Sequence, residues 1–379
     1  MSDPTSDRAL QEAALAALQR GDAKSALAAI GSMTSAPPML LAQAHSRDGN
    51  LDGEAAALRT LLDVDPRHLP ALLAMGQNAL RRADERAAMS FFRAALAQAT
   101  ATGAPPQLHS LLQQAQTRVA ESSRRFEDHL TQAIAGLPAL PRIVHATNLL
   151  LGKAELYLQQ PSMFYFPGLP QRAYYERDEF DWVAPVEAMT DAIVAELKAV
   201  LAEEQDFAPY VESAPDRPAP NNPLRDDPSW GAHYFWRNGG PVADNAQRCP
   251  AVMAALDKAP MPVIAGRSPI ALWSLLKPGT HIAPHHGLLN TRLICHLPLM
   301  APEGCSLRVG AETRAWRMGE MLIFDDSIEH EAWNRSAHTR VVLLFETWRP
   351  EIGIEERDAL SRLFQAIDTY GPGGVDAQN

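Results

Sequence analysis

The chain has few cysteines, no long apolar run and no cluster of basic residues. Only three cysteines occur among 379 residues, without a Cys-x-x-Cys pair, which excludes a disulfide framework and a cysteine-based zinc module. No uninterrupted apolar stretch approaches the roughly 18 residues that a membrane helix needs. A net charge of −11 without a Lys/Arg run argues against nucleic acid as the main partner.

The amino terminus also lacks features of a targeting segment. Residues 1–7 have neither the basic start nor the apolar stretch of a secretory signal. We therefore expect a cytoplasmic protein without a membrane partner.

Aromatic residues are almost absent from the first 150 positions, which contain only Phe91, Phe92 and Phe126. All seven Trp and all seven Tyr lie after residue 156. The chain thus divides into an Ala/Leu-rich half and an aromatic-rich half, and its length agrees with two domains.

The Ala/Leu-rich half has a helical pattern from Ala9 to about Ala120, with apolar residues three and four positions apart. Polar breaks at 21–22, 48–50 and 82–84 recur at about 28 to 34 residues. This spacing is typical of paired antiparallel helices stacked into a short solenoid, and the segment 65–96 resembles a tetratricopeptide repeat. The alternative is an unspecialised helical bundle.

Short β-type runs replace the helical pattern after about residue 160. We expect strands at 270–276, 292–299, 306–309, 321–324 and 340–345. Gly, Pro and Asn/Asp turns separate these runs, which favours an antiparallel sandwich or jelly roll over βαβ units.

The sequence therefore predicts an α+β multidomain chain. The expected parts are a tetratricopeptide-like helical domain at 1–122, connecting helices at 123–160, a jelly-roll domain at 161–352, and a closing helix with a frayed tail at 353–379.

Seven of the twelve histidines lie between residues 233 and 338. Such clustering suggests a metal site, because neutral imidazole binds Fe, Zn, Cu and Ni. Pro284 prevents His281 and His285 from forming an i, i+4 ligand pair on a regular helix, which argues against a zincin site. His330 lies 45 positions after His285, and the two can meet only if a barrel brings two strand ends together.

Arg340 follows His330 by ten positions and begins the apolar run 341–345. On a strand, its guanidinium would point into the barrel. A buried guanidinium there would require a carboxylate, best held by two parallel hydrogen bonds.

Between Trp273 and Trp348 the chain contains the elements PGTH, PHHG, NTRL, HLPL, EGC, IFDDS, EHEAW and RVVLLFETW. In these it resembles the aspartyl/asparaginyl β-hydroxylase family of 2-oxoglutarate- and Fe(II)-dependent oxygenases, which implies a double-stranded β-helix. The resemblance extends more thinly through 164–169 and 230–240 and covers roughly half the chain. Members often carry tetratricopeptide repeats before the catalytic domain, in agreement with the helical pattern found independently.

The resemblance implies that His285 and His330 bind iron. Most oxygenases of the wider superfamily add a carboxylate from a His-x-Asp/Glu motif, but that position is Gly287 here. The resembled family shares this departure and has water in the vacant place. The alternatives are a non-catalytic site, or Asp325 or Asp326 as a third ligand.

The resemblance also implies how 2-oxoglutarate is held. Arg340 would bind its distal carboxylate with Ser274 adding a hydroxyl donor, and His296 would hold the carboxylate nearest the metal. Ile294 stands where the family has an arginine, so the anchoring of co-substrate or substrate must differ in detail.

Two further arginines are candidates for binding an acidic group of the substrate. Arg292 matches a family arginine, and Arg308 is a weaker candidate of the same kind. Alternatively, Arg292 pairs with an Asp or Glu on the surface. We expect the turn at 325–327 to cap local amides and to present His330.

Taken together, these features predict a 2-oxoglutarate- and Fe(II)-dependent dioxygenase. The family implies hydroxylation of an unactivated carbon, namely the β-carbon of an aspartyl or asparaginyl residue or of a related amino acid. Its partners would be a peptide, protein or amino-acid substrate, together with a protein bound by the helical repeats. Two alternatives remain at this point: an adaptor with a catalytically silent cupin-like domain, and a zinc hydrolase.

Overall fold

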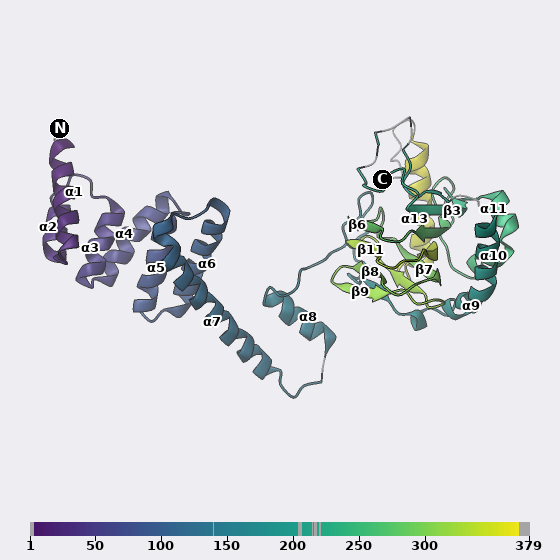
Figure 1. Ribbon diagram of the computed structural model, residues 1–379, viewed down its shortest axis with the longest axis horizontal. Helices are drawn as coiled ribbons and strands as arrows, with labels where there is room; N and C mark the ends of the chain where they lie inside the picture. Colours follow the sequence, from purple (N-terminus) through teal and green to yellow (C-terminus); the bar gives the residue numbers. More distant parts are fainter. Residues whose placement is uncertain are drawn as a thin grey trace. The chain divides into compact units, whose positions relative to one another are not determined.

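The chain separates into two compact units in the computed structural model (Figure 1): Met1–Lys153, called the helical unit below, and Ala154–Asn379, called the β unit. The residues that the structure describes are 4–138, 140–203, 207–213, 215, 218–219 and 221–370. The end of the chain, where the frayed tail was predicted, lies outside them.

The helical unit consists of successive helices, of which the first seven pack against one another along the chain. They are α1 (Pro4–Gln19), α2 (Ala23–Gly31), α3 (Pro38–Asp48), α4 (Leu51–Val64), α5 (Leu69–Arg81), α6 (Glu85–Thr102), α7 (His109–Ala133) and α8 (Pro141–Leu150), with the 3-10 turn η1 (Pro106–Leu108) before α7.

Each predicted polar break is the turn inside one antiparallel helix pair. Asp22, Asn50 and Asp84 cap α2, α4 and α6, because each side chain accepts a hydrogen bond from a backbone N–H three residues ahead. A side chain at Gly76 of α5 would collide with the Phe92 ring of α6, so a glycine lets this pair approach closely. The tetratricopeptide-like repeat is confirmed.

The predicted boundary between 122 and 123 falls inside α7, because no polar break interrupts that helix. The connecting region predicted to reach residue 160 also ends earlier. Its last helix, α8, ends at Leu150, and Gln159 is a buried residue of the β unit.

The β unit contains two antiparallel sheets that together form the predicted jelly roll (Figure 1). The larger has the order β1-β10-β7-β12-β5-β3-β2, with β4 paired to β3, and the smaller has the order β6-β11-β8-β9. The strands are β1 (Tyr174–Tyr175), β2 (Ala208–Pro209), β3 (Trp230–Arg237), β4 (Gly240–Pro241), β5 (Ala271–Leu276), β6 (His281–His285), β7 (Arg292–Met300), β8 (Cys305–Val309), β9 (Glu312–Ala315), β10 (Leu322–Phe324), β11 (His330–Asn334) and β12 (Arg340–Trp348).

All five predicted strands are present as β5, β7, β8, β10 and β12. Their apolar side chains form two cores. One lies on the outer face of the large sheet, where Trp273 and Phe345 pack with helical residues such as Leu197 and Val252. The other lies between the sheets, where Val342 and Leu307 meet. The functional site described below lies at this second core.

Helices cover the large sheet and close the β unit. They are η2 (Arg177–Glu179), α9 (Val183–Glu187), α10 (Thr190–Ala202), α11 (Ala243–Arg248), α12 (Pro250–Leu256) and α13 (Ile354–Thr369). The closing helix predicted within 353–379 is α13, whose Leu360 and Phe364 are buried. Over the described part of the chain, no helix combines the length and apolarity required to cross a membrane.

Candidate active site

One cavity of the β unit brings together six of the seven predicted site residues from five different strands. They are His285, Ser274, Arg292, His296, His330 and Arg340. Arg308 does not line this cavity. The antiparallel pairing of β12 with both β5 and β7 places Ser274, His296 and Arg340 in one sheet, and β6 with β11 forms the opposite wall.

His285 and His330 face each other across the β6–β11 ladder. They are partners in the strand register, and their ring centroids are 4.1 Å apart. In each ring, Nδ1 is bonded to the carbonyl two residues earlier, of Ala283 at 2.8 Å and of Ile328 at 3.1 Å. A carbonyl can only accept, so Nδ1 carries the proton and Nε2 keeps a free lone pair suited to a metal.

Both imidazoles are held in the neutral form that binds metals. Burial, reinforced by the neighbouring His285, lowers the pKa of His330 well below its ordinary value. His285 lies at the cavity mouth and is accessible to solvent, but the protein around its other faces desolvates the ring enough to lower its pKa too.

Asp326 occupies the space that a side chain at position 287 would need. A Cβ added to Gly287 would collide with the Asp326 carboxylate, and the Gly287 N–H donates to the Asp326 carbonyl at 2.6 Å. Burial raises the pKa of Asp326 to about 7, and its Oδ1 has no hydrogen-bond partner. Among the described residues, no group of three or more His, Cys, Asp or Glu side chains has metal-binding geometry. A metal here would therefore take two imidazoles and no third side chain.

Arg340 is a buried cation without a carboxylate. Its side chain is 1% exposed, its Nη1 donates to the Ser274 carbonyl at 3.1 Å and to the Ser274 hydroxyl at 3.4 Å, and its Nε has no partner. The guanidinium lies over the Trp316 ring, 4.6 Å from its centroid. Burial lowers the pKa of Arg340 to about 10, which still leaves it charged at neutral pH.

His296 adds a second unpartnered donor to the same cavity. Trp316 Nε1, which can only donate, is 3.3 Å from His296 Nδ1, so Nδ1 accepts and Nε2 carries the proton. That Nε2 has no partner, and burial lowers the pKa of the ring well below its ordinary value. Arg340 and His296 thus each have an N–H donor at the cavity without an acceptor, and a bound ligand would supply these acceptors.

Arg292 pairs with a carboxylate, as one alternative expected, but inside the protein and not on the surface. Its Nη1 forms an ion pair with Glu346, which is 1% exposed, and its Nη2 lies 3.8 Å from Asp326 Oδ2. Although burial alone would lower the pKa of Arg292, these two carboxylates raise it. Ile294 also lines the cavity and adds an apolar surface where the family has a cation.

The prediction that Arg308 binds the substrate finds no support in its position. Its guanidinium is engaged by Glu329, Glu331 and the Gly310 carbonyl, on the face of β11 that flanks His330. The sequence alone does not show that Glu331 of β11 and Glu329 just before it lie beside Arg308, nor that they hold the guanidinium away from the cavity.

Comparison with known proteins identifies a family for part of the β unit. A family model described as "Aspartyl/Asparaginyl beta-hydroxylase" matches residues 187–350. This segment belongs to the aspartyl/asparaginyl β-hydroxylase family.

Several curated relatives align with part of the chain. The mouse protein "Aspartyl/asparaginyl beta-hydroxylase" is 37% identical over 138 residues, 36% of this chain and 18% of its own length. Human "Aspartate beta-hydroxylase domain-containing protein 2" is 30% identical over 55% of each chain. "Ornithine lipid ester-linked acyl 2-hydroxylase" of Rhizobium tropici is 33% identical over 46% of this chain and 60% of its own. The aligned segments thus span less than two thirds of each relative.

Among solved structures, a Pseudomonas putida prolyl-4-hydroxylase aligns with 43% of this chain and 87% of its own, at 16% identity and a TM-score of 0.26. The Sgt2 TPR domain from Aspergillus fumigatus aligns with 32% of this chain and 83% of its own, at 22% identity and a TM-score of 0.28.

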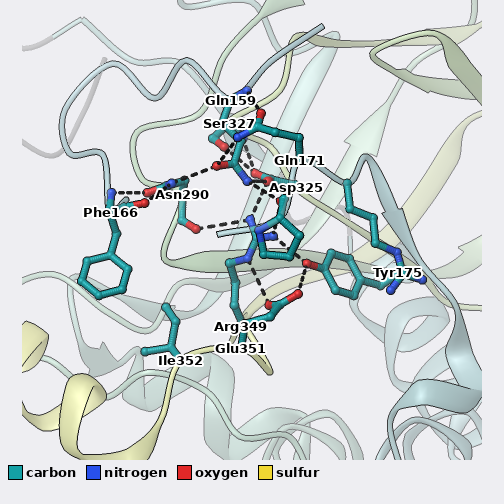
Figure 2. Close-up of polar contacts among 12 residues, drawn as sticks. Gln159, Phe166, Gln171, Tyr175, Asn290, Asp325, Ser327, Arg349, Glu351 and Ile352 are labelled. Atoms are coloured by element: carbon teal, nitrogen blue, oxygen red, sulfur yellow. Dashed lines mark hydrogen bonds and ion pairs between the residues drawn. The ribbon is translucent and has the colours of Figure 1, made fainter. Parts of the chain in front are cut away.

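A buried polar network that sequence reasoning missed supports the turn of the β-hydroxylase domain that precedes His330 (Figure 2). Asp325 Oδ1 accepts from the backbone N–H and hydroxyl of Ser327, as expected for a capping turn. Its Oδ2 accepts from Arg349 Nη1 at 2.5 Å and from Gln159 Nε2 at 2.6 Å. Arg349 and Asp325 are both fully buried. Asp325 therefore has the structural role of fixing the turn and is not free to bind a metal.

Gln159 connects this turn to the segment after Gly287. Its side-chain oxygen accepts from Asn290 Nδ2 at 3.0 Å, and Asn290 in turn bonds both backbone groups of Phe166. Neighbouring backbone groups add to the link, since the Gln160 N–H donates to the Ser327 carbonyl and the Ser162 N–H to the Gly287 carbonyl. We call residues 159–166 the strap. It lies before the family match. Its residues 164–166 belong to the thin part of the resemblance, but nothing in the sequence indicates that Gln159 reaches the turn before His330.

Proposed function

We propose that this protein is an Fe(II)- and 2-oxoglutarate-dependent dioxygenase that hydroxylates an unactivated carbon. The carbon proposed is the β-carbon of an aspartyl or asparaginyl residue or of a related amino acid. The family match of residues 187–350 supports the assignment as a hydroxylase. The side chains that line the cavity support the proposed cofactors, Fe(II) and 2-oxoglutarate.

The unpaired charge of Arg340 is the observation that carries the proposal. Among the described residues, four arginines are buried, and three have a carboxylate partner: Arg267 with Asp368, Arg292 with Glu346, and Arg349 with Asp325. Arg340 has none. Leaving a buried charge unpaired costs on the order of several kcal/mol, so the site is suited to an anionic ligand that compensates it. The distal carboxylate of 2-oxoglutarate would do so through two parallel hydrogen bonds.

The donor set of the cavity fits Fe(II). His285 and His330 would hold the ion through their free Nε2 atoms, whose orientation is set by the Nδ1–carbonyl bonds. When bound, iron supplies the redox chemistry that couples decarboxylation of 2-oxoglutarate to the insertion of oxygen into a C–H bond.

The remaining residues position the co-substrate and exclude water. Arg340 and Ser274 would fix its distal carboxylate, and the His296 Nε2–H would donate to the carboxylate at the other end. The apolar side chains of Ile282 and Leu307 cover the cavity from the smaller sheet. Arg292 would contact the substrate.

The test is Fe(II)-dependent release of CO2 from 2-oxoglutarate by the full chain. His285→Ala and Arg340→Ala should each abolish it, whereas the surface variant Arg317→Ala should not, since that side chain is 76% exposed. Release that survives both cavity changes would refute the site. Zinc in the isolated protein without oxygen consumption would indicate a hydrolase instead.

Substrate delivery is the second part of the proposal. The helical unit would bind a protein, which is the usual role of helical repeats, and the reaction would take place in the cytoplasm. A screen of peptides and amino acids for a mass gain of one oxygen atom, run with iron and 2-oxoglutarate, would identify the substrate class. A lipid acyl chain belongs in that screen because the Rhizobium tropici relative is named for one.

A further inference from the structure

Two of the three cations that line the cavity are paired with carboxylates. Its cations are Arg237, Arg292 and Arg340, and its carboxylates are Glu212, Asp326 and Glu346. Arg237 pairs with Glu212 at 2.9 Å, and Arg292 pairs with Glu346. Arg340, the unpaired cation of this set, is assigned to the co-substrate. No uncompensated cation of the described cavity remains for an acidic group on the substrate.

Glu346 cannot move away to release Arg292. The carboxylate is 1% exposed, and its Oε1 also accepts from the Ile270 N–H at 3.1 Å. Breaking a buried ion pair leaves an uncompensated charge at a cost of about 3–5 kcal/mol. The negative charge of Glu346 therefore stays beside the guanidinium whether or not a substrate is bound.

Near Glu346, two polar atoms lack hydrogen-bond partners, and one of them is a donor while the other is an acceptor. Arg292 Nε is a buried donor without an acceptor, and Asp326 Oδ1 is a buried acceptor without a donor. The two side chains are neighbours, with Arg292 Nη2 3.8 Å from Asp326 Oδ2. A carboxamide can accept from the first and donate to the second. Opposite ionised Asp326, a carboxylate satisfies only Arg292 and is repelled by both Asp326 and Glu346.

We infer that the substrate group facing Arg292 and Asp326 is a carboxamide, so that the protein hydroxylates asparaginyl in preference to aspartyl substrates. This inference rests on the proposed function. Ile294 agrees with it, because an apolar side chain lines the cavity where a family arginine would add a cation for a second carboxylate.

The experiment uses the full chain with Fe(II), 2-oxoglutarate and a library of short blocked peptides in pairs that differ only in Asn or Asp at the central position. Succinate formed above the peptide-free rate and the mass of the peptide product are measured together. The Asn member should have a kcat/KM at least about tenfold higher, since placing like charges together in a binding site costs several kcal/mol.

Two variants test the cause of the preference. Glu346→Gln removes the charge that compensates Arg292, and Ile294→Arg adds a cation to the cavity wall. Each should reduce the Asn-to-Asp ratio by about tenfold or more. The matched control is Glu312→Gln, which removes an exposed carboxylate from β9, outside the cavity, and should leave the ratio unchanged. If Glu346→Gln does not fold, Ile294→Arg decides alone.

Several outcomes would overturn the inference: an Asp peptide that is turned over as well as its Asn partner, no turnover of either while 2-oxoglutarate is consumed, or an unchanged ratio in the folded variants. Absence of 2-oxoglutarate consumption under every condition is a different result, because it contradicts the proposed function itself.

Discussion

At the scale of single residues, the site is defined by polar atoms that the protein leaves without partners. Arg340 Nε, His296 Nε2, Arg292 Nε and Asp326 Oδ1 are all buried, unpartnered and located around one cavity. Buried polar groups elsewhere are usually hydrogen-bonded, because an unmet donor or acceptor costs about 1–3 kcal/mol. Of the eight such side-chain atoms among the described residues, these four share one cavity, which indicates a site whose stability is completed by ligands.

This reasoning makes a prediction for Arg340. Arg340→Met removes an unpaired buried charge and keeps a long side chain over Trp316, so the ligand-free protein should become more stable by about 1–3 kcal/mol. The same change should eliminate stabilisation by 2-oxoglutarate. Denaturant unfolding of the metal-loaded protein with and without 2-oxoglutarate measures both effects.

The matched comparison is Arg349→Met, which breaks a buried ion pair with Asp325 and should instead destabilise by about 3–5 kcal/mol. Equal destabilisation by the two substitutions would mean that Arg340 is compensated in the ligand-free protein after all.

Sequence reasoning could identify such residues only in part. The motifs selected His285, His330 and Arg340, and the structure brings them together. The partners of Arg292 and Arg308 could not be predicted, because Glu346 and Glu331 reach them from neighbouring strands whose register the sequence does not show. Arg308 was the weaker candidate of the two, and the structure places Arg292 but not Arg308 at the cavity.

At the scale of elements, the strands that carry the two histidines are among those that the sequence did not predict. β5, β7 and β12 are apolar and buried over most of their length, so their composition revealed them. β6 and β11 contain histidine, proline or glutamate at positions where a core strand has apolar residues. On the two strands that carry the proposed metal ligands, polar residues therefore replace the apolar pattern by which a strand is predicted.

The strap supplies a prediction at this scale. Gln159→Ala leaves Asp325 with one partner fewer and Asn290 Nδ2 without its side-chain acceptor, so the protein should lose about 1–3 kcal/mol of stability. Because the turn at 325–327 precedes His330, affinity for a divalent metal should fall as well. Unfolding by denaturant and a Mn²⁺ titration measure the two effects.

Gln160→Ala is the matched control, since the link of Gln160 to Ser327 uses its backbone N–H, which alanine retains. A Gln159→Ala protein that is destabilised but binds Mn²⁺ normally would limit the strap to a structural role.

At the scale of the whole molecule, the two compact units divide between Lys153 and Ala154, whereas the predicted boundary of the jelly-roll domain followed residue 160. Composition placed the boundary where the aromatic residues become frequent and the helical pattern stops. It could not show that residues 154–160, which were predicted as part of the connecting helices, belong to the β unit and that Gln159 reaches the loop before His330. These residues are tied to the β unit by long-range hydrogen bonds, and such bonds produce no periodic pattern in the sequence.

Two fragments that end at Asn379 separate these boundaries. The one that begins at Ala154 retains Gln159 and the Gln160 backbone bond to Ser327, and the one that begins at Pro161 loses both. The longer fragment should unfold cooperatively and release CO2 from 2-oxoglutarate with Fe(II). The shorter one should be less stable by at least about 1–3 kcal/mol and should bind Mn²⁺ more weakly, because Asp325 loses a buried partner. Equal stability and metal affinity of the two fragments would contradict the role of the strap and would restore the boundary predicted from composition.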